Sequence, residues 1–271
     1  MYINQKLKKV IDMKQKFFVT SDIHSGYTPL KKALDEKGFD PSNETHWLVV
    51  CGDCFDRLGE SKELLKYLMS LKRKILVKGN HDLLLEELCL RGFPYSHDKS
   101  NGTTRTVQDI SGKYSAYDFA EACDITFKKT ARYRKLLVNY FETQNYIFIH
   151  SFIPTIKIGY DNYEYKENWR EATDQEWETA MWGNCINMAL DGLNKTGKTI
   201  VMGHYHCSYG HMCNSKGKHS EFGENAIWEP WYYNNCIAID RCVAYTNELN
   251  LLVIEDEFDT NWLNKYKKEF E

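Results

Sequence analysis

The sequence has no long hydrophobic run. Nowhere do 18 apolar residues follow one another, and the first residues carry scattered lysines where a secretory signal would have an apolar stretch. We therefore expect no transmembrane helix, no secretory signal and a cytoplasmic protein. The nine cysteines are an odd number in a long chain, which favours reduced thiols over a disulfide framework.

The chain also lacks an excess of basic residues. Its 35 Lys and Arg face 38 Asp and Glu, and the net charge is −3. This balance argues against stable nucleic-acid binding, although it leaves a small phosphorylated substrate open. Internal repeats, low-complexity tracts and linkers are absent too, so we expect the 271 residues to form a single domain.

Short apolar runs alternate with helical patterns along the first part of the chain. Runs at 17–19, 47–51 and 75–77 predict buried strands, whereas 60–72 and 81–90 have apolar residues at helical spacing. This order predicts an α/β fold. The remaining predictions are an insertion at about 95–145, irregular at first and helical over 116–143, within a core of about 16–256, and further strands at 146–149, 199–202, 236–239 and 249–254.

Residues that can bind metals follow five of these predicted strands. They are Asp22, His24, Asp53, Asn80, His150, His204 and His206. The carboxyl ends of strands gather at one edge of an open α/β sheet, so these residues can converge although the sequence separates them. A mixture of oxygen and imidazole ligands suits Mn, Fe or Zn. Gly52, Gly79 and Gly203 stand where the chain must turn sharply to direct a ligand.

The motifs SDIH (21–24), GDCFDR (52–57), GNHD (79–82) and GHYH (203–206), with His150 after a strand, resemble the calcineurin-like metallophosphoesterases. Their order and spacing match over about 16–256. The resemblance implies a four-layer α/β/β/α sandwich with a dimetal site at the C-terminal edge of the strands. It implies that Asp22, His24, Asp53 and His206 hold the first of two divalent ions. Asp53 would bridge to the second, which Asn80, His150 and His204 would complete.

The resemblance also implies roles for the residues beside the metals. A hydroxide bridging the ions would attack phosphorus, and His81 would protonate the leaving group, with Asp82 orienting its imidazole. Arg57 would bind phosphate oxygens as a planar fork, held by Asp56. The expected catalytic residues are thus His81, Asp82 and Arg57, and the expected substrate-binding residues are Arg57, Asn80 and His81. Arg105 and Arg170 are alternative candidates for a second phosphate contact.

The GDxxDR form is typical of the serine/threonine protein phosphatases and the related diadenosine-tetraphosphate hydrolases. The sequence departs from those protein phosphatases at Asp82, where they usually carry Glu, and at the second histidine of GHYH. Our first hypothesis is a protein-phosphatase-like phosphomonoesterase acting on a phosphorylated protein. The alternative is a phosphodiesterase of dinucleoside polyphosphates or other nucleotides. A non-catalytic scaffold is disfavoured because every expected ligand is present.

The sequence leaves two further points open. Trp169, Trp177, Trp182, Trp228 and Trp231 could line a substrate groove by stacking, but packing is the favoured interpretation. Nothing in the residue pattern predicts the oligomeric state.

Overall fold

Two five-stranded sheets form the centre of the molecule. The computed structural model describes residues 14–160 and 162–266. The first sheet has the order β12-β1-β2-β3-β4 and the second the order β10-β11-β9-β6-β5. The strands of the first sheet are β1 (Gln15–Thr20), β2 (His46–Cys51), β3 (Lys74–Val77), β4 (Leu137–Val138) and β12 (Leu252–Asp256). Those of the second are β5 (Phe141–Glu142), β6 (Tyr146–Phe148), β9 (Thr199–His206), β10 (Trp231–Tyr233) and β11 (Cys236–Asp240). A separate hairpin pairs β7 (Thr155–Lys157) with β8 (Tyr163–Tyr165).

The central strands of each sheet run parallel. In the first sheet Val49 of β2 pairs with Val19 of β1 and with Ile75 of β3. In the second, β9 lies between β6 and β11, parallel to both. Because parallel strands end at the same edge, the residues that follow β1, β2 and β3 are brought together, as are those that follow β6, β9 and β11.

The parallel strands bury both of their faces, which explains their continuous apolar runs. Phe17 of β1 points to the second sheet, where its ring lies 5.4 Å from Phe141 and 6.4 Å from Phe148. Phe18 points the other way, into a cluster with Leu30 and Leu64 from the covering helices. Alternation along a single strand therefore joins one sheet to the other and to a helical layer.

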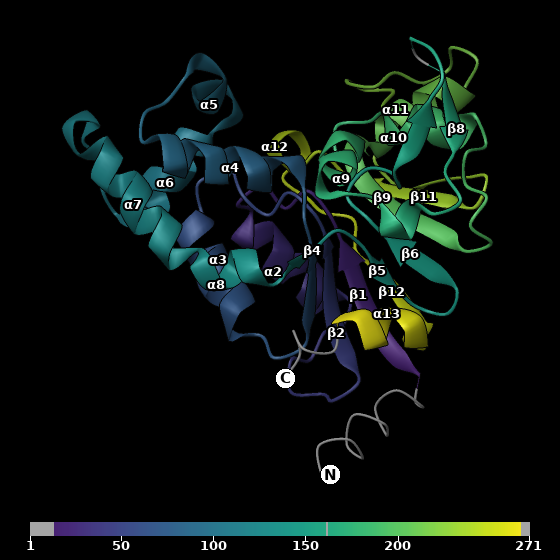
Figure 1. Cartoon of the computed structure of the whole chain (residues 1–271), viewed down its shortest axis with the longest axis horizontal. Helices are drawn as coiled ribbons and strands as arrows, with labels where there is room; N and C mark the ends of the chain where they lie inside the picture. The colour runs from purple at the N-terminus through teal and green to yellow at the C-terminus, as the bar shows by residue number, and fades with distance from the viewer. Residues whose placement is uncertain (1–13, 161, 267–271) are drawn as a thin grey trace.

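Helices cover the outer face of each sheet, so the layers are α/β/β/α, as predicted (Figure 1). Helices α2, α3, α4, α6 and α7 lie on the side of the first sheet, and α9, α10 and α11 lie on the side of the second. Their bounds are α2 (Tyr27–Glu36), α3 (Ser61–Ser70), α4 (Asn80–Arg91), α6 (Thr103–Ser111), α7 (Phe119–Lys129), α9 (Asp174–Ala180), α10 (Cys185–Leu190) and α11 (Cys207–Asn214). Shorter helical segments are α5 (Ser96–Asn101), η1 (Ala116–Asp118), α8 (Ala131–Lys135), η2 (Trp169–Glu171), α12 (Val243–Thr246) and α13 (Thr260–Tyr266).

The segment 95–145 differs from its prediction at both ends. It is helical from Ser96 onward, and its last helix ends at Lys135. The following residues form β4 and β5, which extend one sheet each. The early part has polar residues of low helix propensity, but burial of Thr103 and Thr106 stabilises α6 through tertiary contacts that sequence periodicity does not show.

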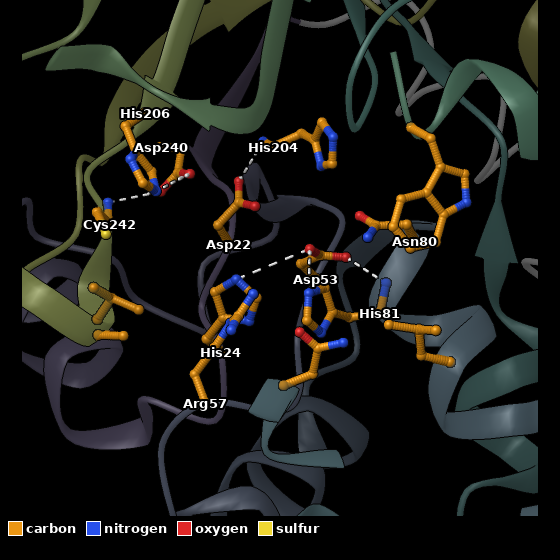
Figure 2. A pocket seen from close by; sticks show the side chains of 15 residues that line it. Asp22, His24, Asp53, Arg57, Asn80, His81, His204, His206, Asp240 and Cys242 are labelled. Atoms are coloured by element: carbon orange, nitrogen blue, oxygen red, sulfur yellow. Dashed lines mark hydrogen bonds and ion pairs between the residues drawn. The ribbon is translucent and has the colours of Figure 1, made fainter. Parts of the chain in front are cut away.

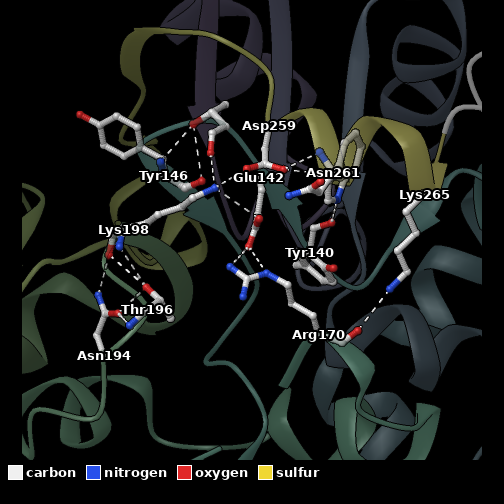
Figure 3. A network of polar contacts seen from close by, with 12 residues as sticks. Tyr140, Glu142, Tyr146, Arg170, Asn194, Thr196, Lys198, Asp259, Asn261 and Lys265 are labelled. Atoms are coloured by element: carbon white, nitrogen blue, oxygen red, sulfur yellow. Dashed lines mark hydrogen bonds and ion pairs between the residues drawn. The ribbon is translucent and has the colours of Figure 1, made fainter. Parts of the chain in front are cut away.

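A buried network of charges ties the second sheet to the C-terminal segment (Figure 3). Glu142 of β5 is 3% exposed and pairs with Arg170 at 2.7 Å and with Lys198 at 3.3 Å. The Lys198 ammonium also donates to Asp259 at 2.8 Å. Lys198 precedes β9, at the end of the strand opposite His204 and His206. Arg170 is thus committed to this network and is not a residue of the pocket described below.

All nine cysteines are free thiols, as the sequence predicts. Across residues 14–160 and 162–266, no helix has both the length and the apolar content to cross a membrane.

Candidate dimetal centre

The predicted ligand residues meet where strands of both sheets end. Asp22 and His24 follow β1, Asp53 follows β2, Asn80 follows β3 and His150 follows β6. His204 and His206 lie at the C-terminal end of β9. Six of the seven line one pocket of about 430 Å³, and His150 is buried next to Asp53 beneath it. In Figure 2, Asp53 lies in the middle, Asn80 lies on one side, and His206 and Asp240 lie together on the other.

Glycines let these strand ends pack against one another. A Cβ on Gly79 would lie 2.2 Å from the Asp53 Oδ1, and one on Gly203 would lie 2.1 Å from the Asp22 Oδ2. Both distances are shorter than non-bonded contacts allow, so a larger residue would displace the carboxylate. The two glycines therefore set the positions of Asp22 and Asp53.

The backbone of the site is strained. Four site residues have positive φ, from 46° to 68°: Asp22, His24, Asp53 and His204. This left-handed region costs a non-glycine residue about 1–2 kcal/mol. Backbone hydrogen bonds retain this conformation: the Asp22 N–H donates to Gly52 and the His24 N–H to Asp53. Strained residues gathered at one pocket are a mark of a functional site.

Asp53 joins two groups of potential metal ligands. His24, Asp53 and His81 form one group, and Asp53, His150 and His204 the other, each with donor atoms within 4.8 Å of one another. The Asp53 Oδ2 lies 3.9 Å from the Nε2 of His24 and of His81, whereas Oδ1 lies 3.5 Å from the His150 Nε2. One carboxylate thus presents a different oxygen to each group.

The ring nitrogens at the site are oriented as metal binding requires. The His24 Nδ1 lies 2.9 Å from the Phe55 carbonyl, and the His150 Nδ1 lies 3.1 Å from the Cys51 carbonyl. A carbonyl only accepts, so each Nδ1 carries the proton and each Nε2 turns a lone pair toward Asp53. On His150 this lone pair also faces the Asn80 Oδ1 at 2.7 Å. Buried lone pairs that face one another repel, and a bound cation would offset this repulsion. These residues therefore fit a metal centre.

Burial and the charges of neighbouring groups shift the pKa values of the carboxylates and histidines at the site. Burial, Asp240 and Asp53 together raise the pKa of Asp22. Burial opposes ionisation of Asp53 as well, but the neighbouring histidines, His150 first among them, hold its pKa below the ordinary value. Burial lowers the pKa of His24 to about 4 and that of His204 to about 3. Both rings are therefore neutral near pH 7, which is the state that binds metals.

The structure places His206 apart from the two ligand groups. The His206 Nδ1 lies 3.4 Å from the Glu221 carboxylate, and Nε2 lies 3.9 Å from the Asp240 Oδ2. Asp240 is 4% exposed and lines the same pocket, although the sequence analysis did not single it out. A signal was present, because Asp240 directly follows the run predicted as a strand at 236–239, as the other carboxylates follow theirs.

Asp56 supports His81, a role that the sequence analysis gave to Asp82. The His81 Nδ1 lies 2.7 Å from the Asp56 Oδ2. Asp56 is completely buried and accepts hydrogen bonds from Thr103 at 2.7 Å and from Thr106 at 2.9 Å. Burial lowers the pKa of His81, but Asp53 and Asp56 outweigh it, and the net shift is upward. The sequence analysis did not find the two threonines, which lie in the first turns of α6.

Asp82 stabilises the start of α4. Its Oδ2 accepts from the Gly79 N–H at 2.8 Å, and its Oδ1 accepts from the Tyr133 hydroxyl at 2.6 Å. This carboxylate satisfies the N-terminal backbone of the helix, so the expectation that Asp82 orients the imidazole is wrong.

The arginines near the site differ in position. Arg57 lines the pocket, and its backbone N–H donates to Asn101 at 3.0 Å. Asp56 is engaged by His81 and the two threonines, and Arg57 is held at its backbone by the Asn101 carbonyl. The Arg105 guanidinium packs against Gly59, outside the residues that line the pocket.

Relatives of known name share parts of this chain. It is 29% identical over 138 residues to a symmetrical bis(5'-nucleosyl)-tetraphosphatase of Pseudomonas fluorescens (strain SBW25), covering 51% of this chain and 43% of that protein. It is 41% identical over 69 residues, 25% of each protein, to the enzyme of the same name from Thioalkalivibrio sulfidiphilus (strain HL-EbGR7). The chain thus spans less than half the length of these curated relatives.

The fold also matches a solved structure. A mutant of a cold-active protein tyrosine phosphatase has a TM-score of 0.50 and 16% identity, with 89% of this chain and 75% of that one covered. The family model described as Calcineurin-like phosphoesterase matches residues 15–243. Since that match covers most of the chain, the protein belongs to the calcineurin-like phosphoesterase family.

Proposed function

We propose that the chain hydrolyses dinucleoside polyphosphates at this pocket. The observation that carries the proposal is the position of the Asp53 carboxylate. One of its oxygens faces the first ligand group and the other faces the second, and His81 and Arg57 lie beside it. The names of the matched relatives support a dinucleoside tetraphosphate as the substrate. They favour the nucleotide alternative over the first hypothesis, a phosphorylated protein.

The proposed ligands of the two divalent ions are the seven residues predicted from the sequence. Asp53 would be shared by both ions. Asp22, His24 and His206 would hold the first ion, with His206 turning from Asp240 toward it, and the second would be held by Asn80, His150 and His204. Two bound cations would polarise the phosphoryl oxygens and offset the negative charge that develops during hydrolysis. Mn, Fe or Zn suits this mixture of carboxylate, amide and imidazole donors.

Two residues beside the proposed metal ligands, His81 and Arg57, would act on the substrate directly. His81 would hold a proton for the departing phosphate oxygen, with Asp56 orienting the ring through Nδ1. Arg57 would bind non-bridging phosphate oxygens, and its planar fork can make two parallel hydrogen bonds. Water supplies the oxygen that joins phosphorus as the bond to the leaving phosphate breaks.

Substrate preference tests the proposal. Chelated protein with Mn²⁺ restored would be assayed on diadenosine tetraphosphate, p-nitrophenyl phosphate and a phosphoserine peptide. We expect the highest kcat/KM for the dinucleotide, with two ADP as products by anion-exchange chromatography. A higher kcat/KM for the phosphopeptide would return the assignment to the protein-phosphatase hypothesis.

A further inference from the structure

Three aromatic side chains form a contiguous surface beside the pocket. The rings of Phe222, Trp228 and Tyr245, here called the aromatic platform, have centroids 5.4–5.9 Å apart. Phe222 is 46% exposed, Tyr245 is 58% exposed and Trp228 is partly buried. Phe222 and Trp228 come from the loop after α11 and Tyr245 comes from α12, and strands β10 and β11 separate the two segments in sequence. Large aromatic rings gathered on a surface mark a binding site more often than isolated ones do.

The platform continues the proposed phosphate pocket. The His206 ring, which lines the pocket, lies 5.5 Å from Phe222 and 6.2 Å from Trp228. On the other side of the platform, Tyr245 directly follows Val243 and Ala244, which also line the pocket. A ligand with its phosphates in the pocket can therefore extend over the platform without leaving the surface.

Packing alone does not account for the platform. Trp169, Trp177 and Trp231 are 0–3% exposed and belong to the core between and outside the sheets, as the packing interpretation expects. None of the platform residues belongs to the two buried hydrophobic clusters found among the described residues. The five tryptophans named from the sequence thus divide into three core residues and two at the pocket: Trp182, which is 52% exposed and lines the pocket, and Trp228, which supports the exposed rings of the platform.

We propose that the platform stacks one nucleobase of a substrate whose phosphates lie in the pocket. This inference rests on the proposed function and deepens it by placing the base. Every base has a flat π face, so stacking binds bases with little discrimination and needs no fixed set of hydrogen bonds. The platform would therefore favour nucleotides over base-free polyphosphates while accepting adenine and guanine alike.

The test uses two non-hydrolysable ligands that differ only by the nucleoside. Binding of α,β-methylene-ADP and of methylenediphosphonate to Mn²⁺-loaded protein would be measured by calorimetry for the wild type, F222A and Y245A. We expect each variant to weaken binding of α,β-methylene-ADP about 5- to 150-fold, the range for loss of one stacked base. Binding of methylenediphosphonate should change less than about twofold. Y117A removes a fully exposed tyrosine outside the platform and should leave both affinities unchanged.

The outcomes separate this inference from the proposed function. Equal weakening of both ligands, or no weakening, would overturn the platform as a base site. Hydrolysis of diadenosine tetraphosphate with unaltered KM in F222A and Y245A would overturn it as well, while the proposed function stood. If the dinucleotide is not hydrolysed but the nucleoside still improves binding through the platform, the proposed function fails and the base site remains. Y245F retains a stacking surface and should bind α,β-methylene-ADP like the wild type.

Discussion

At the scale of single residues, Asp53 is the side chain on which the site depends most. It is 2% exposed and stands between both ligand groups. Replacing Asp53 by Asn removes the shared charge with little change in shape, so we expect turnover to fall by at least about 10³-fold and metal content to fall with it. Activity assays and elemental analysis check this, with D35N, an exposed site on α2, as the control. Near-normal turnover of D53N would contradict the assignment.

His81 allows a second test at this scale. If it protonates the leaving group, its loss matters most when the leaving group is a strong base that needs the proton. We expect H81A to lower kcat for alkyl phosphates about 10²- to 10⁴-fold and to lower kcat for p-nitrophenyl phosphate much less. A series of esters with graded leaving-group pKa measures the difference. Equal slowing across the series would argue against proton donation.

The residue scale also shows how far sequence reasoning reaches. The predicted ligands converge because each stands at the C-terminal end of a strand, and the positions of strands along the chain can be inferred from apolar runs. The partner of His81 could not be inferred in this way, because Asp82 is adjacent in sequence while Asp56 is brought near by Thr103 and Thr106. The position of His206 beside Asp240 and Glu221 depends in the same way on a loop whose path has no periodic signal.

At the scale of elements, the close approach of strand ends is what shapes the site. Gly203 in β9 lies against Asp22 after β1, with room for no side chain. We expect G203A to weaken Mn²⁺ binding and to lower the free energy of unfolding by about 1–3 kcal/mol, the usual effect of overpacking. Calorimetry and urea unfolding check both. G197A is the control: it has φ of +79° but no atom within 4 Å of the added Cβ, so it should retain metal affinity.

The charge network of Lys198 holds β5, β9 and the start of α13 together, away from the site. K198M removes the ammonium that pairs with both Asp259 and Glu142 and leaves Glu142 only its pair with Arg170, so we expect the free energy of unfolding to fall by about 3 kcal/mol. K195M, an exposed neighbour, should change it by less than about 0.5 kcal/mol. Urea unfolding of both variants measures this. A loss in K195M as large as that in K198M would contradict the role of the network.

The loss of stability in K198M should depend on pH. Burial opposes ionisation of Asp259, but the hydrogen bond and charge of Lys198, together with the backbone N–H groups of Trp262 and Asn261, outweigh burial and hold the pKa of Asp259 below the ordinary value. A carboxylate with a depressed folded pKa stabilises the fold above its unfolded pKa of about 4, and this contribution is lost as pH falls through the folded pKa. The difference between wild type and K198M should therefore be full at pH 7 and shrink below pH 4. Unfolding series at several pH values measure it, and a constant difference would contradict the pair.

Elements were predictable to different degrees. The strands at 17–19, 47–51 and 75–77 were found because burial on both faces leaves unbroken apolar runs. The helices α5 and α6 were not, because their sequence is polar and their stability comes from contacts such as the pair between Arg91 and Asp98. The strands β4 and β5 have two residues each, which is too short for any period to show.

At the scale of the whole molecule, the site belongs to neither sheet alone. The first sheet supplies Asp22, His24 and Asp53, and the second supplies His150 and His204, so a bound cation would connect the two. Metal that binds only the folded state stabilises it by about 2.7 kcal/mol at 100 times its Kd. For a chain of this size we therefore expect Mn²⁺ to raise the Tm of chelated protein by roughly 5–10 °C.

The shift in Tm also reports whether the two sheets are joined through Asp53. Thermal unfolding of D53N followed across a Mn²⁺ titration should show little or no rise, because the remaining ligands lack the charge common to both groups. K195M, with an intact site, should show the full rise. Equal shifts in D53N and wild type would mean that the stabilising metal binds elsewhere and that metal binding at the pocket does not stabilise the fold. A rise that is present in wild type, retained in K195M and absent in D53N would establish that cations at this pocket stabilise the arrangement of both sheets.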